Sequence, residues 1–152
     1  MLGNYSLGHR VLYLGKLFEQ SFQLSATVEP VLYCCTVLPL RQKKASYYVL
    51  NNGNRLCLFM AEPSKGLRET RLAGTSSALD DTAVSQLIRL WGLGKQLFHK
   101  PHALPLFTAG VRDAHIAVFA TPIFGAGDKF MAALVLSGPA SRLIASRSCR
   151  CK

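Results

Sequence analysis

Residues 115–139 of the chain read HIAVFATPIFGAGDKFMAALVLSGP. Residues 115–124 and 130–137 are two apolar runs that are rich in side chains favoured in strands. Residues 125–128, which read GAGD, separate the runs and can form a tight turn. The pattern predicts two antiparallel strands that are joined as a β-hairpin.

A second hairpin is predicted earlier in the chain. Residues 45–50 (ASYYVL) and 55–60 (RLCLFM) are short strand-like runs on either side of Asn51-Asn52-Gly53-Asn54. An Asn-Gly pair readily adopts the positive φ angles of a two-residue hairpin turn. Residues 67–72 and 104–108 are weaker strand candidates.

Helices are predicted at residues 6–24, 27–38 and 82–91, with Thr27 and Asp81 as the N-caps of the second and third. The first helix has apolar residues at helical spacing, which places them on one face: Leu7, Val11, Leu14, Phe18 and Phe22. This stripe packs either on the domain's own core or on a partner subunit, and the sequence leaves both open. Together these elements predict an α+β fold, in which helices pack on an antiparallel sheet.

The composition limits the classes of function. The 152 residues suffice for one domain, and 18 Lys and Arg against 8 Asp and Glu give a formal charge of +10. Basic residues are scattered, and the clusters at 41–44 and 142–152 lack the aromatic side chains that stack on nucleobases. We therefore favour a solvated basic surface and keep polyanion binding as an alternative.

Neither a signal peptide nor an apolar stretch of about 18 residues is present. We expect a soluble cytoplasmic protein with no membrane partner. The chain has five cysteines, an odd number that cannot all form disulfides within the chain. We expect the adjacent Cys34 and Cys35 to be buried free thiols, which agrees with a reducing compartment.

Catalytic and metal-binding patterns are weak. No Gly-x-Ser-x-Gly elbow is found, and no nucleophile stands in an arrangement that implies a base and an oxyanion hole. His99 and His102 are separated by a proline-containing spacer, and Cys149 and Cys151 form an isolated pair. We expect no enzymatic activity, no metal and no cofactor.

Residues 120–143, ATPIFGAGDKFMAALVLSGPASRL, resemble the signature of the effector domain of IclR-type transcription regulators. Tyr5-Ser-Leu-Gly8 and Leu14-Gly15 are similar to that family's linker helix, and Gly74, Leu79, Thr82 and Ala83 to its glycine loop and following helix. The resemblance implies a GAF- or profilin-like fold with a pocket between the sheet and the 74–83 loop. It also implies a small organic effector that changes DNA affinity, and assembly into dimers or tetramers.

The resemblance points to loop and strand residues as the candidate ligand-binding set: Gly74, Thr75, Ser76, Ser77, Val118, Val135 and Ser137. Val118 and Val135 stand where carboxylate-binding members carry a cysteine and a serine, and Ser85 stands where the family has a glycine. With fewer polar donors, the pocket is expected to prefer an effector more apolar than a small carboxylate, or none. The strand residues can equally be plain sheet core.

The predicted organisation is a linker or dimerisation helix at 1–25, an effector-binding domain at 26–143 and a disordered basic tail at 144–152. From the resemblance we expect this sequence to lack the winged helix-turn-helix through which the family binds DNA, because the sequence begins where the linker helix would. The predicted function is that of an effector-sensing domain of a transcription regulator. A ligand-free dimerisation module and a basic polyanion-binding domain remain as alternatives.

Overall fold

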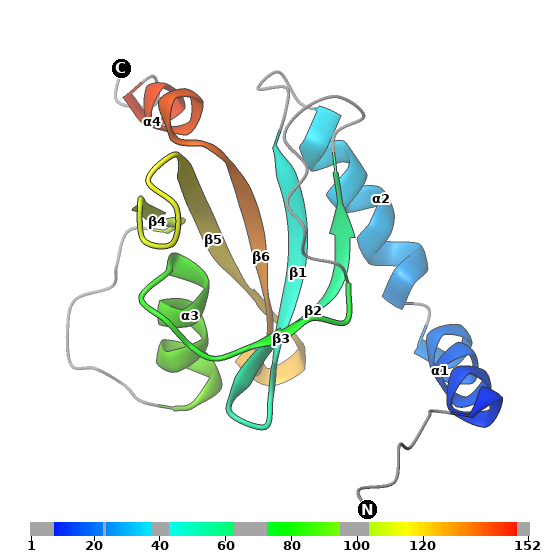
Figure 1. Cartoon of the computed structure of the whole chain (residues 1–152). Coiled ribbons are helices and arrows are strands. Elements are labelled where there is room, and N and C mark those ends of the chain that lie inside the picture. The colour runs from blue at the N-terminus through cyan, green and yellow to red at the C-terminus, as the bar shows by residue number, and fades with distance from the viewer. Residues whose placement is uncertain (1–7, 23, 38–42, 63–72, 95–103, 149–152) are drawn as a thin grey trace, which may run out of the picture.

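The structure is a computed structural model that describes residues 8–22, 24–37, 43–62, 73–94 and 104–148. Within these ranges, six strands form one antiparallel sheet in the order β3-β2-β1-β6-β5-β4 (Figure 1). The strands are β1 Lys44–Asn51, β2 Asn54–Ala61, β3 Ser76–Ser77, β4 Leu106–Ala109, β5 Ile116–Phe124 and β6 Phe130–Pro139. The helices are α1 His9–Phe22, α2 Leu24–Val37, α3 Ala83–Leu87 and α4 Ala140–Ser148. The predicted α+β class, an antiparallel sheet flanked by helices, is confirmed.

Both predicted hairpins are present. Asn52 and Gly53, with φ angles of 48° and 77°, form the turn between β1 and β2. The β5–β6 hairpin turns through residues 125–129, with a short 3-10 turn at Ala126–Asp128. Strand β6 pairs with β1 as well as with β5, so it joins the two hairpins into one sheet.

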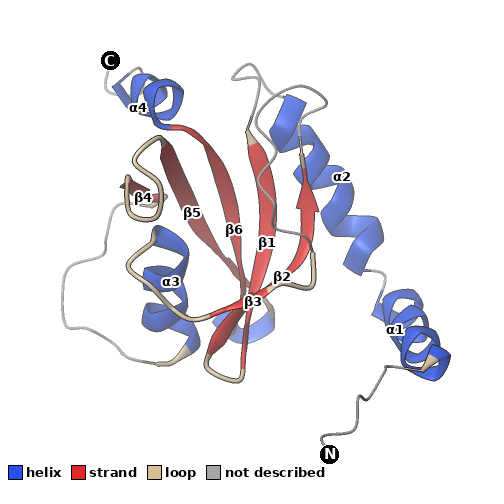
Figure 2. Cartoon of the chain, in the orientation of Figure 1, coloured by secondary structure: helices blue, strands red, loops and turns tan. Residues whose placement is uncertain are grey.

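The sheet separates two apolar layers, with α2 on one face and α3 on the other (Figure 2). Because neighbouring residues of a strand point to opposite faces, Ala132 of β6 packs in the α2 layer while Ala133 and Val135 pack in the α3 layer. Leu32 of α2 and Leu87 of α3 are both fully buried and fix their helices to the sheet.

Helix α1 contributes little to this core. Residues 8–18 are all exposed, and Val11, Leu14 and Phe18 of the predicted stripe are between 51% and 63% exposed. Figure 1 shows α1 beyond the end of α2 and away from the sheet. Of the two alternatives for the stripe, packing on the domain's own core is not observed for these residues.

Two predictions for α2 are wrong. The helix begins at Leu24, so Thr27 is not its N-cap and Pro30 lies inside the helix. Packing of Leu32 against β1 and β2 stabilises the helix despite this proline. Cys34 is exposed, although it was predicted to be a buried thiol. Cys35 is half-buried, and its thiol pKa is raised, mainly by this burial and secondly by the neighbouring Cys34.

Two further segments differ from their predictions. Thr82, and not Asp81, is the N-cap of α3, and the helix continues as a π-helical turn at Ile88–Gly92. A disordered tail is predicted from residue 144 onward, but residues 144–148 belong to helix α4. The fully buried Leu143 anchors this helix to the domain. The strand candidate at 67–72 lies outside the described residues. No helix in the described ranges is both long and apolar enough to cross a lipid bilayer.

Candidate functional site

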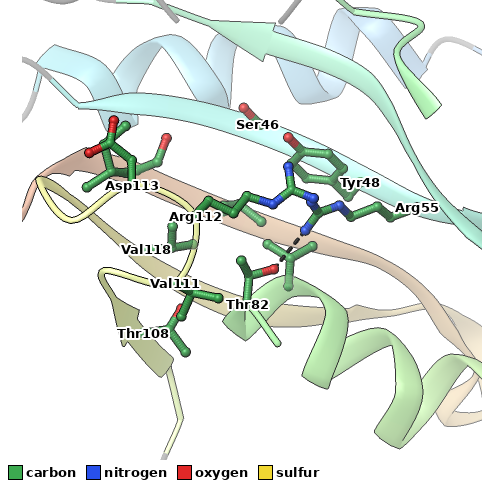
Figure 3. Close-up of a pocket in the computed structure, with 13 residues that line it drawn as sticks. Ser46, Tyr48, Arg55, Thr82, Thr108, Val111, Arg112, Asp113 and Val118 are labelled. Carbon is green, nitrogen blue, oxygen red and sulfur yellow. Dashed lines mark hydrogen bonds between the residues drawn. The ribbon is translucent and has the colours of Figure 1, made fainter. Parts of the chain in front are cut away.

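A cavity of about 300 Å³ lies between the sheet and the start of α3 (Figure 3). Strands β1, β2, β4, β5 and β6 line it together with α3 and the turn between β4 and β5. Pockets of roughly 300–1,000 Å³ are typical for small organic ligands. The cavity is therefore large enough for a compact molecule.

One part of the cavity wall is apolar. Its branched side chains come from α3, the β4–β5 turn, β5 and β6: Val84, Val111, Ile116, Val118 and Val135. Strand pairing explains why β5 and β6 supply side chains to the same space, since Val118 pairs with Ser137 and Ala120 pairs with Val135. A ligand with an apolar body can contact this wall.

Hydroxyl groups form a second part of the wall. They belong to Ser46 and Tyr48 of β1, Thr82 before α3, Thr108 of β4 and Ser137 of β6. The Thr108 hydroxyl accepts a hydrogen bond from the backbone N–H of Ala83 at 3.0 Å, which ties β4 to the start of α3. The cavity thus offers hydrogen-bonding groups next to its apolar side.

The centre of the polar side is a buried arginine. Arg55 of β2 has a side chain that is only 4% exposed, and its two terminal nitrogens bind the two oxygens of Asp80 at 3.1 and 3.0 Å. Nη1 of Arg55 also donates to Oγ1 of Thr82 at 2.7 Å and to Oγ of Ser85 at 3.2 Å. Such a two-pronged pair with added hydrogen bonds is the arrangement that a buried charge needs.

Asp80 also organises the start of α3. Its Oδ1 accepts hydrogen bonds from the backbone N–H of Thr82 at 3.1 Å, from the Thr82 hydroxyl and from the Ser85 hydroxyl at 2.8 Å. In return, the backbone N–H of Asp80 donates to Oγ of Ser85 at 3.1 Å. Ser85, which stands where the resembled family has glycine, is fully buried and joins this network.

A second arginine binds the same carboxylate. Arg112, in the β4–β5 turn, lines the cavity and its Nε donates to Oδ2 of Asp80. Figure 3 shows its guanidinium beside that of Arg55. Asp80 therefore pairs with two cationic groups, and the cluster carries one excess positive charge.

The predicted site residues fall into two groups. Val118, Val135 and Ser137 all line the cavity. The four loop residues Gly74, Thr75, Ser76 and Ser77 do not. They follow the edge of β2 instead: Ser76 and Ser77 pair with Leu56 and Arg55, and the backbones of Gly74 and Thr75 bond to Cys57 at 2.7 and 3.1 Å. Their backbone groups therefore extend the sheet at the edge of β2, and none of the four residues lines the cavity.

Sequence reasoning missed the charged part of the site. Arg55 begins the apolar run RLCLFM, and an arginine at a core-facing position of such a strand is a signal that could have identified it. Asp80 and Arg112 lie in loops and have no comparable signal, since their position against Arg55 depends on tertiary structure.

No group of three or more metal-binding side chains occurs within the described ranges. The weak pairs His99 with His102 and Cys149 with Cys151 lie outside those ranges.

The fold is shared with solved bacterial transcription regulators. A C-terminal domain of a putative transcriptional regulator from Vibrio cholerae superimposes with a TM-score of 0.68 at 19% identity, covering 86% of this chain and 91% of that one. A putative IclR regulator from Silicibacter sp. gives a TM-score of 0.70 at 19% identity, covering 91% of this chain and 65% of that one. The chain has the fold of an IclR-type C-terminal domain.

A third IclR-type structure was solved with a bound ligand. An IclR homologue from Microbacterium hydrocarbonoxydans, in complex with 4-hydroxybenzoate, gives a TM-score of 0.68 at 14% identity and covers 88% of this chain. The chain spans about 65% of the length of this homologue and of the Silicibacter regulator. The first two neighbours are putative transcriptional regulators, and the third is an IclR homologue. No protein-family model and no curated protein matches the chain.

Neutralising Asp80 should destabilise the domain strongly. In Asp80→Asn the buried Arg55 loses its counter-charge, and breaking a buried pair in this way costs about 3–5 kcal/mol. Asp81→Asn is a matched control, because Asp81 is 91% exposed and its 3.5 Å contact with Arg89 lies at the surface. In urea unfolding, the free energy of unfolding of the control should change by less than about 1 kcal/mol. Equal effects of the two variants would contradict the assignment.

Proposed function

We propose that the chain is a small-molecule effector-sensing domain of a transcription regulator, in which ligand binding changes assembly and thereby DNA affinity. The observation that carries the proposal is the cavity between the sheet and α3, which combines an apolar wall with a cluster of charged side chains around the buried Arg55. A largely apolar wall with a few polar or charged groups is typical of small-molecule binding sites. The IclR-type fold and the 4-hydroxybenzoate complex of one structural neighbour support it.

The charge cluster changes the expected chemistry of the effector. The valines at 118 and 135 favour an apolar ligand, as the sequence suggested, but Arg55 and Arg112 add cationic donors to the same space. A ligand that has both an apolar body and an anionic group satisfies both parts of the wall. Aromatic and short aliphatic monocarboxylates are therefore the first compounds to test.

Self-association through α1 is the second part of the proposal. Six large apolar side chains of this helix are between 42% and 67% exposed: Val11, Leu12, Tyr13, Leu14, Leu17 and Phe18. Val11, Leu14 and Phe18 share one face of the helix, and an exposed apolar stripe is typical of an interaction site in soluble proteins. For the polyanion alternative, no observation in the described ranges favours a nucleic-acid surface over scattered basic residues.

Filling the cavity should abolish ligand binding. Thermal unfolding of the wild-type chain is measured with 4-hydroxybenzoate, benzoate and pyruvate; a compound at 100 times its Kd adds about 2.7 kcal/mol of stability. In Val118→Phe the added ring occupies the cavity, so the ligand-induced rise in Tm should disappear. Val31→Phe, at a helix position that is 50% exposed, should keep the full rise.

The rise in Tm, and not the Tm itself, is compared, because overpacking alone costs about 1–3 kcal/mol. No rise for any compound with the wild-type chain, or an unchanged rise with Val118→Phe, would contradict the proposed binding function.

Charged substitutions in α1 should convert the assembly to monomers. Leu14→Glu and Leu17→Glu place a carboxylate in the apolar surface, whose burial between subunits would then be unfavourable. Sedimentation velocity should report a multimer for the wild-type chain and for the control Arg10→Glu, and a monomer for the two variants. A wild-type monomer, or variants that keep the wild-type mass, would reject self-association through this helix.

A further inference from the structure

We infer that Arg112 is the residue that sets the charge specificity of the cavity, with Asp80 acting as the fixed counter-ion that orients its guanidinium. The inference rests on the proposed small-molecule function and specifies the ligand: an apolar body with a single anionic group, a small monocarboxylate.

The first step is the unused hydrogen-bonding capacity of Arg112. A guanidinium has five N–H donors in one plane. Asp80 accepts the one on Nε, and no other interaction of Arg112 occurs in the described part of the chain. The two terminal amino groups therefore remain for a ligand, and together they match the two oxygens of a carboxylate.

The second step is orientation. A flexible surface arginine loses side-chain entropy when it binds a ligand. Arg112 is already held at Nε by a carboxylate whose own position is fixed by Arg55, Thr82 and Ser85. The side chain of Arg112 is 32% exposed, whereas that of Arg55 is 4% exposed. Of the two arginines, Arg112 is therefore the one that a ligand entering from solvent can contact. Asp80 thus places a cationic fork at the cavity before any ligand arrives.

The third step is the charge balance. Arg55 and Arg112 supply two positive charges and Asp80 one negative charge, which leaves one positive charge in the partly enclosed cluster. Asp113 also lines the cavity, but it is exposed and its Oδ1 accepts the backbone N–H of His115 at 2.8 Å. Water screens an exposed charge strongly. One anionic group neutralises the cluster, whereas a second one would introduce repulsion from Asp80.

Arg55 adds an independent sign that the cavity is not complete by itself. Its Nε is buried and has no hydrogen-bond partner in the described part of the chain. A buried donor without a partner is costly.

The test compares two ligands of the same shape and different charge. Isothermal titration of the wild-type chain with benzoate and with benzamide should give a benzoate affinity about tenfold or more above that of benzamide, the effect of hydrogen bonds to an ionised group. Arg112→Gln should remove this preference, so that benzoate no longer binds more tightly than benzamide. Arg112→Lys, which keeps the charge but not the fork, should retain part of it.

Two controls keep the outcomes distinct. Arg89→Gln removes a positive charge that does not line the cavity, and it should leave both affinities unchanged. Terephthalate, which carries a second carboxylate on the same ring, should bind more weakly than benzoate.

Each alternative result has a definite meaning. A benzoate preference that persists in Arg112→Gln, or its loss in Arg89→Gln, would overturn the role of Arg112 while leaving the binding function in place. Equal binding of benzoate and benzamide by the wild-type chain would do the same. Binding of neither compound would count against both this inference and the proposed function.

Discussion

The ion pair between Arg55 and Asp80 is the interaction on which the arrangement of the domain depends. It joins the first hairpin to the loop before α3, two segments that are 25 residues apart in sequence. A guanidinium that is 4% exposed is tolerable only when it is paired and hydrogen-bonded. The chain meets this condition with one carboxylate and two hydroxyl groups, and in doing so it fixes where α3 begins.

The cavity follows from that constraint. With the start of α3 held by Asp80, Thr82 and the Thr108 bond to Ala83, the helix covers one end of the sheet face and leaves the other end to the β4–β5 turn. The space between them is lined by valine side chains on one side and by charged and hydroxyl groups on the other. A site of this composition can discriminate ligands by charge as well as by shape, because the guanidinium groups are only partly accessible to screening by water.

Local sequence patterns were sufficient for the two hairpins. Asn52-Gly53 and the turn at 125–128 have few alternative conformations, and the strands next to them alternate or are apolar throughout, so both hairpins could be predicted. Val118, Val135 and Ser137 were predicted from the resemblance to IclR-type effector domains, and all three line the cavity. Helix ends were less predictable, as α2 shows: tertiary packing of Leu32 outweighs the helix-breaking tendency of Pro30.

The charged half of the site could not be predicted, since it depends on which distant segments meet. The sequence analysis named only Asp81, as a helix cap, yet Asp80 is the residue that pairs with Arg55, while Asp81 is 91% exposed. The glycine loop at 74–77 was expected at the cavity, but its backbone instead pairs with the open edge of β2. Asp80 pairs with Arg55, and the glycine loop pairs with β2, the strand that contains Arg55. Both pairings join segments that are distant in the sequence, so they could be seen only in the folded structure.

A double-mutant cycle on Arg55 and Asp80 tests this account most directly. Free energies of unfolding are measured for the wild-type chain, Arg55→Met, Asp80→Asn and the double variant, and the same cycle is made for the surface pair of Arg89 and Asp81. The account predicts a coupling energy of about 2 kcal/mol or more for the buried pair, against about 0.2–1 kcal/mol for the exposed pair. A coupling for Arg55 and Asp80 no larger than that of the exposed pair would show that the domain does not depend on this interaction.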